Sequence, residues 1–161
     1  MPANLRFSVA LHILTLLAAN GTGLLTSEEI ASSVDTNPVV IRRVMASLRE
    51  SGLVESRPGV NGGWRLKKTP ASITLCKVFE TVREDDLLAM HAHPNPDCPI
   101  GGHIRDSLHK VFADAEKALH GSLSNQTIAD VLEDVRARAY EPGRLKSPLR
   151  LQSRPSSASA K

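Results

Sequence analysis

The segment from Thr26 to Leu66 constrains the fold more than any other part of the chain, because it carries start signals for two helices and then a hairpin. Thr26 followed by Glu29 forms a capping box, which starts a short helix. Asn37 followed by Pro38 suits the N-cap and first turn of a second helix. Helix, turn, helix and hairpin in this order predict a winged helix-turn-helix.

The helix after Asn37 has two distinct faces. Apolar side chains recur at helical spacing and predict the face that packs on the core: Ile41, Val44, Met45 and Leu48. The N-terminal part of a recognition helix approaches base edges, which predicts a second set of residues in the major groove: Asn37, Val39, Val40, Arg42 and Arg43. Arg49, further along, is predicted to hold a phosphate.

A hairpin is expected next, with strand-like runs over 53–57 and 64–68. Pro58-Gly59 and Asn61-Gly62-Gly63 are turn signals between them. Three wing residues are predicted to reach DNA, Arg57 through the minor groove and Asn61 and Gly62 through backbone amides at phosphates.

Charge supports a nucleic-acid partner. Between residues 36 and 68 there are seven basic side chains and two acidic ones, in a chain whose net formal charge is +3. Such clustering is typical of phosphate-binding surfaces. Each arginine taken alone is more often part of a solvated face, so the prediction depends on helix, wing and charge coinciding.

The same segment resembles the Rrf2 family of bacterial winged-helix regulators, the IscR-like group. The resemblance rests on EEIA in the first helix, NPVVIRRVMASLRESGLVES across the second, and GGWRL in the wing. It covers about residues 1–135 and implies a transcriptional regulator, most often a repressor, that binds double-stranded DNA as a homodimer.

A loop is expected over residues 84–98, and the unusual part of the chain is the stretch His91–His103, HAHPNPDCPIGGH. In the family this region commonly binds an iron–sulfur cluster through three cysteines. Only Cys98 is present here, so we expect no cofactor, and HPNPDCPIG resembles the cluster-free, YwnA-like branch.

Cys98 before a helix start is a candidate redox sensor, because a helix N-terminus favours a thiolate. His91, His93 and Cys98 are weak metal candidates, since their spacing matches no standard zinc pattern. The third possibility is that the loop has only a structural role.

A long helix is expected over Pro99–His120, ended by Gly121. Its apolar positions alternate spacings of four and three, which predicts a coiled-coil-like dimer interface: Ile104, Leu108, Val111 and Ala115. Packing against helices of the same chain is the alternative. Ser124 or Asn125 is expected to start a last helix. From residue 136 onward, basic, proline-containing and serine-rich sequence predicts a disordered tail.

Composition narrows the remaining classes. Two distant cysteines do not indicate a disulfide framework, and neither a signal peptide nor an apolar run of membrane-spanning length is recognised, so we expect a cytoplasmic protein without a membrane partner. No acid–base pair, nucleophile–base motif or phosphate loop is present, which predicts that the protein is not an enzyme.

The sequence therefore predicts a mainly α fold, a winged helix-turn-helix with a small β-hairpin wing and a long C-terminal dimerisation helix. Its expected parts are a DNA-binding domain over 1–83, a loop over 84–98, dimerisation helices over 99–135 and a tail over 136–161. The expected function is sequence-specific transcriptional regulation, with an effector left open. Two alternatives remain: a winged-helix module that regulates an enzyme by contact, and a metal- or redox-binding protein that uses the His/Cys loop.

Overall fold

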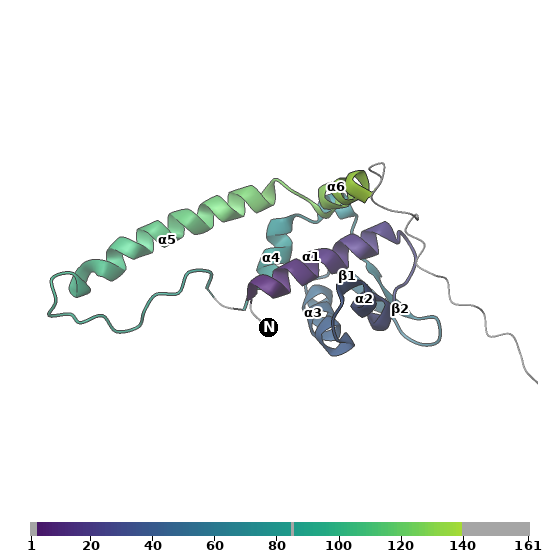
Figure 1. Cartoon of the computed structure of the whole chain (residues 1–161), viewed down its shortest axis with the longest axis horizontal. Helices are drawn as coiled ribbons and strands as arrows, with labels where there is room; N and C mark the ends of the chain where they lie inside the picture. The colour runs from purple at the N-terminus through teal and green to yellow at the C-terminus, as the bar shows by residue number, and fades with distance from the viewer. Residues whose placement is uncertain (1–2, 85, 140–161) are drawn as a thin grey trace, which may run out of the picture.

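A computed structural model of the chain describes residues 3–84 and 86–139 (Figure 1). The helices are α1 (Ala3–Ala19), α2 (Ser27–Val34), α3 (Pro38–Glu50), α4 (Leu75–Val82), α5 (Gly101–Ser124) and α6 (Ile128–Ala139), with a short 3₁₀ turn over Pro70–Ser72. The strands β1 (Val54–Arg57) and β2 (Gly63–Leu66) form one antiparallel sheet. The predicted fold class is confirmed.

Helix α1 is the centre of the core. It is apolar on several sides, and α2, α3, α4, α6 and β2 all contact it. Ile13, Leu14 and Leu17 are at most 1% exposed. Burial of a side chain of this size stabilises a fold by about 1.5–3 kcal/mol. Leu5 near the start of α1 is 51% exposed, whereas Phe7 packs against the core.

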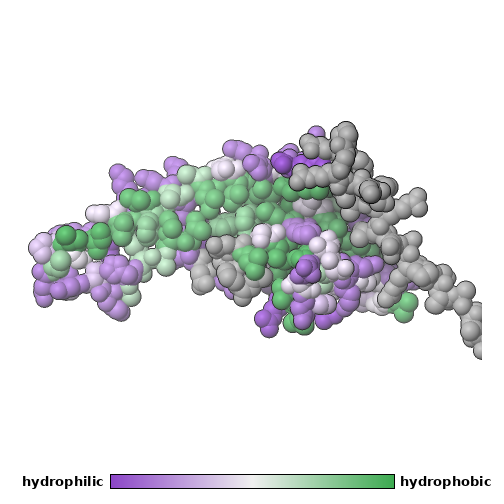
Figure 2. Space-filling model, viewed as in Figure 1, coloured by the Kyte–Doolittle hydropathy of each residue, from purple (hydrophilic) through white to green (hydrophobic). Residues whose placement is uncertain are grey.

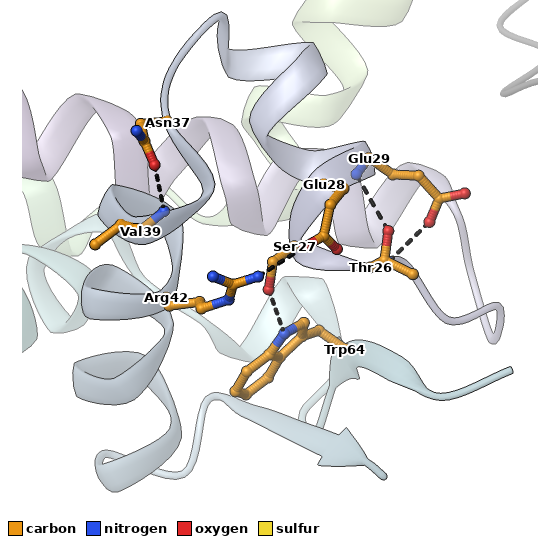
Figure 3. Close-up of polar contacts among 8 residues, drawn as sticks. All are labelled: Thr26, Ser27, Glu28, Glu29, Asn37, Val39, Arg42 and Trp64. Carbon is orange, nitrogen blue, oxygen red and sulfur yellow. Dashed lines mark hydrogen bonds and ion pairs between the residues drawn. The ribbon is translucent and has the colours of Figure 1, made fainter. Parts of the chain in front are cut away.

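The predicted capping box starts α2. The backbone N–H of Thr26 donates to Glu29 Oε2 at 2.8 Å, and the backbone N–H of Glu29 donates to Thr26 Oγ1 at 3.2 Å (Figure 3). The helix ends at Asp35, whose φ of 55° places it in the left-handed region. This reversal directs the chain into Asn37 and α3, so the two helices of the motif contact one another.

Helix α4 connects the winged helix to α5. Thr74 caps it as expected, and the side chains predicted to face inward are all buried: Leu75, Val78, Phe79 and Val82. Phe79 meets Phe7 of α1 edge to face, with ring centroids 5.3 Å apart, and stacks similarly against His120 of α5 at 6.1 Å. This contact fixes the second half of α5 to the body.

Two boundaries near the C-terminus differ from prediction. Gly121 does not end the long helix, which continues to Ser124 because Leu123 packs against the core. The last helix starts at Ile128 rather than at Ser124 or Asn125, because Thr127 forms a second capping box. Its backbone N–H donates to Asp130 Oδ2 at 2.7 Å, and Asp130 N–H donates to Thr127 Oγ1 at 3.3 Å.

The first residues assigned to the tail are helical. Residues 136–139 belong to α6, where Arg138 donates to Asp134 at 2.8 Å across one helical turn. The expectation for residues 140–161 lies outside the described residues. Across the helices described, none has the length and apolar character needed to cross a membrane.

Candidate nucleic-acid interface

Helix α3 is held by its apolar face and presents its polar face to solvent. Asn37 Oδ1 accepts a hydrogen bond from the Val39 N–H at 2.8 Å, and Pro38 occupies the first helical turn (Figure 3). Ile41, Val44, Met45 and Leu48 are at most 1% exposed, as predicted. The outward face carries the side chains expected at DNA: Val39 (50% exposed), Arg42, Arg43 and Arg49, with Val40 partly buried.

Arg42 has a partner that the sequence does not reveal. Its guanidinium lies 2.6 Å from Glu28 Oε1 of α2, and both side chains are more than half exposed. Figure 3 shows the arginine reaching across from α3 toward α2. Exposed pairs of this kind contribute only about 0–1 kcal/mol. A phosphate or base can therefore replace Glu28 at small cost.

The wing is a regular hairpin. Val54 pairs with Leu66, and the register runs to Arg57 opposite Gly63. The loop between the strands needs its glycines: Gly59 has φ +95°, and a side chain at Gly62 would collide with the Arg57 carbonyl. Asn61 adopts φ 63°, a left-handed conformation that asparagine tolerates. Val60 at the tip is 96% exposed.

The wing is anchored to the start of α2, a role that sequence reasoning missed. Trp64 Nε1 donates to Ser27 Oγ at 3.2 Å (Figure 3), and the backbone of Trp64 exchanges hydrogen bonds with Leu25 at 2.8 and 3.1 Å. Trp64 is the only tryptophan of the chain and follows two glycines, which was the available signal. This contact fixes the hairpin relative to the helix-turn-helix.

The basic side chains of the wing differ in their surroundings. Arg57 is exposed at the end of β1, whereas Arg65 pairs with Glu55 across the strands at 2.6 Å. The Gly62 N–H donates to the Gly59 carbonyl at 2.9 Å, so this amide is engaged within the loop. Among the described residues, no ion pair involves Arg43, Arg49 or Arg57.

Figure 1 places α3 and the wing loop along the lower edge of the molecule, with α5 and α6 along the upper edge. The residues predicted at DNA thus come from elements on one side of the body, away from the long helix. Exposed arginines beside a projecting hairpin can bind the phosphates and groove edges of a duplex.

The long helix leaves its apolar side chains uncovered. No residue of α5 is fully buried, Val111 is 58% exposed and Ala115 is exposed. Ile104 and Leu108 are only partly buried. Figure 2 shows a hydrophobic band along this helix. Monomeric proteins rarely expose contiguous apolar surface of this kind.

Cys98 lies half-buried just before α5. The backbone N–H groups of Gly101, and secondarily of Ile100, lower the pKa of this thiol by hydrogen bonding to the thiolate. Among the described residues no group of three or more His, Cys, Asp and Glu side chains is placed to hold a metal ion. His91, His93 and Cys98 are therefore not brought together as a ligand set.

The comparisons with known proteins agree with this geometry. A family model, Rrf2, described as an iron-dependent transcriptional regulator, matches residues 3–134. YwnA of Bacillus subtilis (strain 168), an HTH-type transcriptional regulator by name, is 40% identical over 130 residues, which cover 80% of this chain and 96% of YwnA. IscR of Cereibacter sphaeroides, an HTH-type transcriptional regulator, is 25% identical over 127 residues, 78% of this chain and 81% of IscR.

A solved structure from Lactobacillus plantarum, described as a transcriptional regulator, has a TM-score of 0.72 and 26% identity over 82% of this chain and 90% of that one.

The family description mentions iron, and the side chains of this chain show whether they could hold an iron–sulfur cluster. Iron–sulfur clusters are held by several thiolates, and the chain has two cysteines, Cys76 on α4 and Cys98 before α5. This donor set does not fit such a cluster.

The fold, the exposed basic face and the match over residues 3–134 lead to one assignment: the chain belongs to the Rrf2 family of DNA-binding, winged-helix transcriptional regulators.

Proposed function

We propose that this protein is a homodimeric repressor that covers promoter DNA at a dyad-symmetric site. The observation that carries the proposal is the outward face of α3, whose arginines lie outside the core beside an anchored wing. A helix presented in this way enters the major groove through its N-terminal residues.

The roles follow from position along α3. Asn37, Val39, Val40, Arg42 and Arg43 lie in the first turns or just before them, where base edges are reached. Arginine is suited to guanine, and apolar side chains to the thymine methyl. Arg49 lies in the last turn and binds a phosphate.

The wing supplies the flanking contacts. Arg57 reaches toward the minor groove from the end of β1, and the backbone at Asn61 lies at the tip, where an amide can approach a phosphate. Gly62 shapes the loop, since its own amide is occupied.

The dimer forms through α5. At a rise of about 1.5 Å per residue the 24 residues of α5 span about 36 Å, enough for a long helix–helix seam centred on Leu108. Ile104, Val111 and Ala115 complete that seam. Two copies related by a two-fold axis bind two half-sites in opposite orientation.

Selection of binding sites from random duplex DNA, followed by hydroxyl-radical footprinting, tests the proposal. We expect an inverted repeat whose half-sites lie about one helical turn, or a multiple of it, apart. In promoters that contain the site, the footprint should overlap the polymerase-binding region. An enriched sequence without dyad symmetry, or no enriched sequence, would contradict the proposal.

A further inference from the structure

A cleft of about 370 Å³ lies where the second half of α1 meets α2 and α6. Its walls are apolar: Leu11, Leu16, Val131, Leu132 and Val135. The volume is at the lower end of the range of about 300–1,000 Å³ typical of small-molecule pockets. Neither the DNA-binding face nor the apolar band of α5 accounts for this cleft.

The lining residues include one charged side chain, the cation Arg136. Arg136 of α6 is exposed at the cleft, and His12 of α1 lies at its edge with Nε2 3.1 Å from Ser33 Oγ of α2. No carboxylate belongs to the lining residues. The lining is therefore complementary to an anion with an apolar body.

Thr15 adds a second polar feature at the same place. It lines the cleft and is 8% exposed, and its Oγ1 has no hydrogen-bond partner among the described residues. A buried hydroxyl without a partner is unfavourable. The oxygen is closed off from solvent, but threonine in a helix populates two staggered χ1 rotamers, so a χ1 rotation can move the hydroxyl to another position.

We propose that the cleft binds a small amphipathic carboxylate. Its apolar body, an aromatic ring or a branched or straight alkyl chain, packs between α1 and α6. Its carboxylate pairs with the Arg136 guanidinium, and the Thr15 hydroxyl can donate to it after rotation. A small molecule fits this concave site better than a second copy of the chain, because the uncovered apolar seam that suits a copy lies along α5.

Because the cleft lies beside α2, a bound ligand would also affect the helix-turn-helix. Ser33 belongs to the first helix of the helix-turn-helix, which contacts α3, while α6 follows the long helix α5. A ligand between α1, α2 and α6 would thus restrain the DNA-reading unit relative to α5. That consequence rests on the proposed function, whereas binding itself does not.

Chemical-shift perturbation on the ¹⁵N-labelled full-length protein, without DNA, tests the site. The probes are octanoate, 3-phenylpropionate and 1-naphthylacetate, each compared with its neutral primary amide. We expect at least one carboxylate to shift the amide signals of Thr15, Ser33 and Val135 at millimolar concentration. Its amide should bind about tenfold more weakly, because it lacks the charge-assisted contact.

Three variants locate the binding. Arg136→Ala should weaken the carboxylate about tenfold and leave the amide unchanged. Arg138→Ala is the matched control, since Arg138 pairs with Asp134 on the same helix and does not line the cleft. Val135→Trp should fill the cleft and abolish binding, from a position already 41% exposed.

No perturbation by any of the three carboxylates would overturn the proposal. So would equal affinity of carboxylate and amide, or equal effects of the Arg136 and Arg138 substitutions. A change in the light-scattering mass of Val135→Trp would overturn it as well, because it would make the cleft an interface between copies.

Discussion

Arg42 illustrates how a single side chain can be correctly placed and still have an unforeseen partner. Its exposure follows from helical spacing, but the ion pair with Glu28 depends on how α2 packs against α3. Because both side chains are exposed, the pair contributes only about 0–1 kcal/mol and is easily exchanged. The polyanionic duplex offers several phosphates in place of one carboxylate, so we expect Arg42 to exchange Glu28 for DNA.

The environment of Cys98 predicts how the reactivity of its thiol depends on pH. Hydrogen bonds from the Gly101 and Ile100 N–H groups favour the thiolate, so the folded-state pKa lies below the ordinary value of 9.0. Iodoacetamide alkylation of the Cys76→Ser variant should therefore reach its half-maximal rate at lower pH in the native protein than in denaturant. The thiolate is the reactive form.

The associated stability has a definite sign. A lowered folded-state pKa stabilises the fold above the unfolded value, and this contribution is lost as the pH falls through the folded value. Alkylation midpoints that coincide, or a native midpoint at higher pH, would contradict the assigned environment of Cys98. They would also weaken its candidacy as a redox sensor.

At the scale of elements, a partly buried side-chain hydrogen bond, from Trp64 Nε1 to Ser27 Oγ, anchors the wing beside the backbone hydrogen bonds to Leu25. Trp64→Phe removes the N–H that donates to Ser27, and Ser27→Ala removes the acceptor. A double-mutant cycle, measured by denaturant unfolding followed by circular dichroism, should give a coupling of about 0.5–1.5 kcal/mol. A coupling within error of zero would contradict a stabilising role for this side-chain hydrogen bond.

Helix α5 gives the corresponding prediction for assembly. Leu108→Asp should place a charge in the apolar seam and yield monomers by light scattering, because an unpaired charge is strongly unfavourable when buried. Lys110→Asp is the control, since Lys110 is exposed and outside the seam. If Leu108→Asp remains a dimer of unchanged affinity, the subunits meet through another surface.

Local signals predicted most element boundaries, and their failures have physical causes. Thr26, Asn37 and Thr74 cap helices through contacts a few residues away, which a sequence displays directly. The prediction that Gly121 ends the long helix was wrong, because packing of Leu123 on the core outweighs the modest free-energy cost of a glycine within a helix. The Trp64–Ser27 contact joins residues 37 positions apart, and only the tertiary fold reveals it.

Across the whole molecule, the basic surface and the long helix lie on different edges. The recognition helix and wing occupy one edge, while α5 extends from the other with its apolar side chains uncovered (Figures 1 and 2). In the sequence, the charge pattern predicted the basic surface, and the heptad-like spacing of apolar residues predicted the long helix. The cleft beneath α6 escaped prediction because its walls come from three helices that the sequence does not place together.

Recognition of DNA through α3 can be tested by the equilibrium affinity of Arg42→Ala/Arg43→Ala for the selected DNA site. Both side chains are exposed, so the variant should fold normally and bind about a hundredfold more weakly, since a good base contact is worth about 1–3 kcal/mol. The log–log salt slope should fall by about one for each phosphate that the variant no longer neutralises. Lys77→Ala/Arg138→Ala, which removes two exposed cations from α4 and α6, should bind like wild type. Undiminished affinity of the Arg42/Arg43 variant, or equal weakening in the control, would contradict recognition through α3.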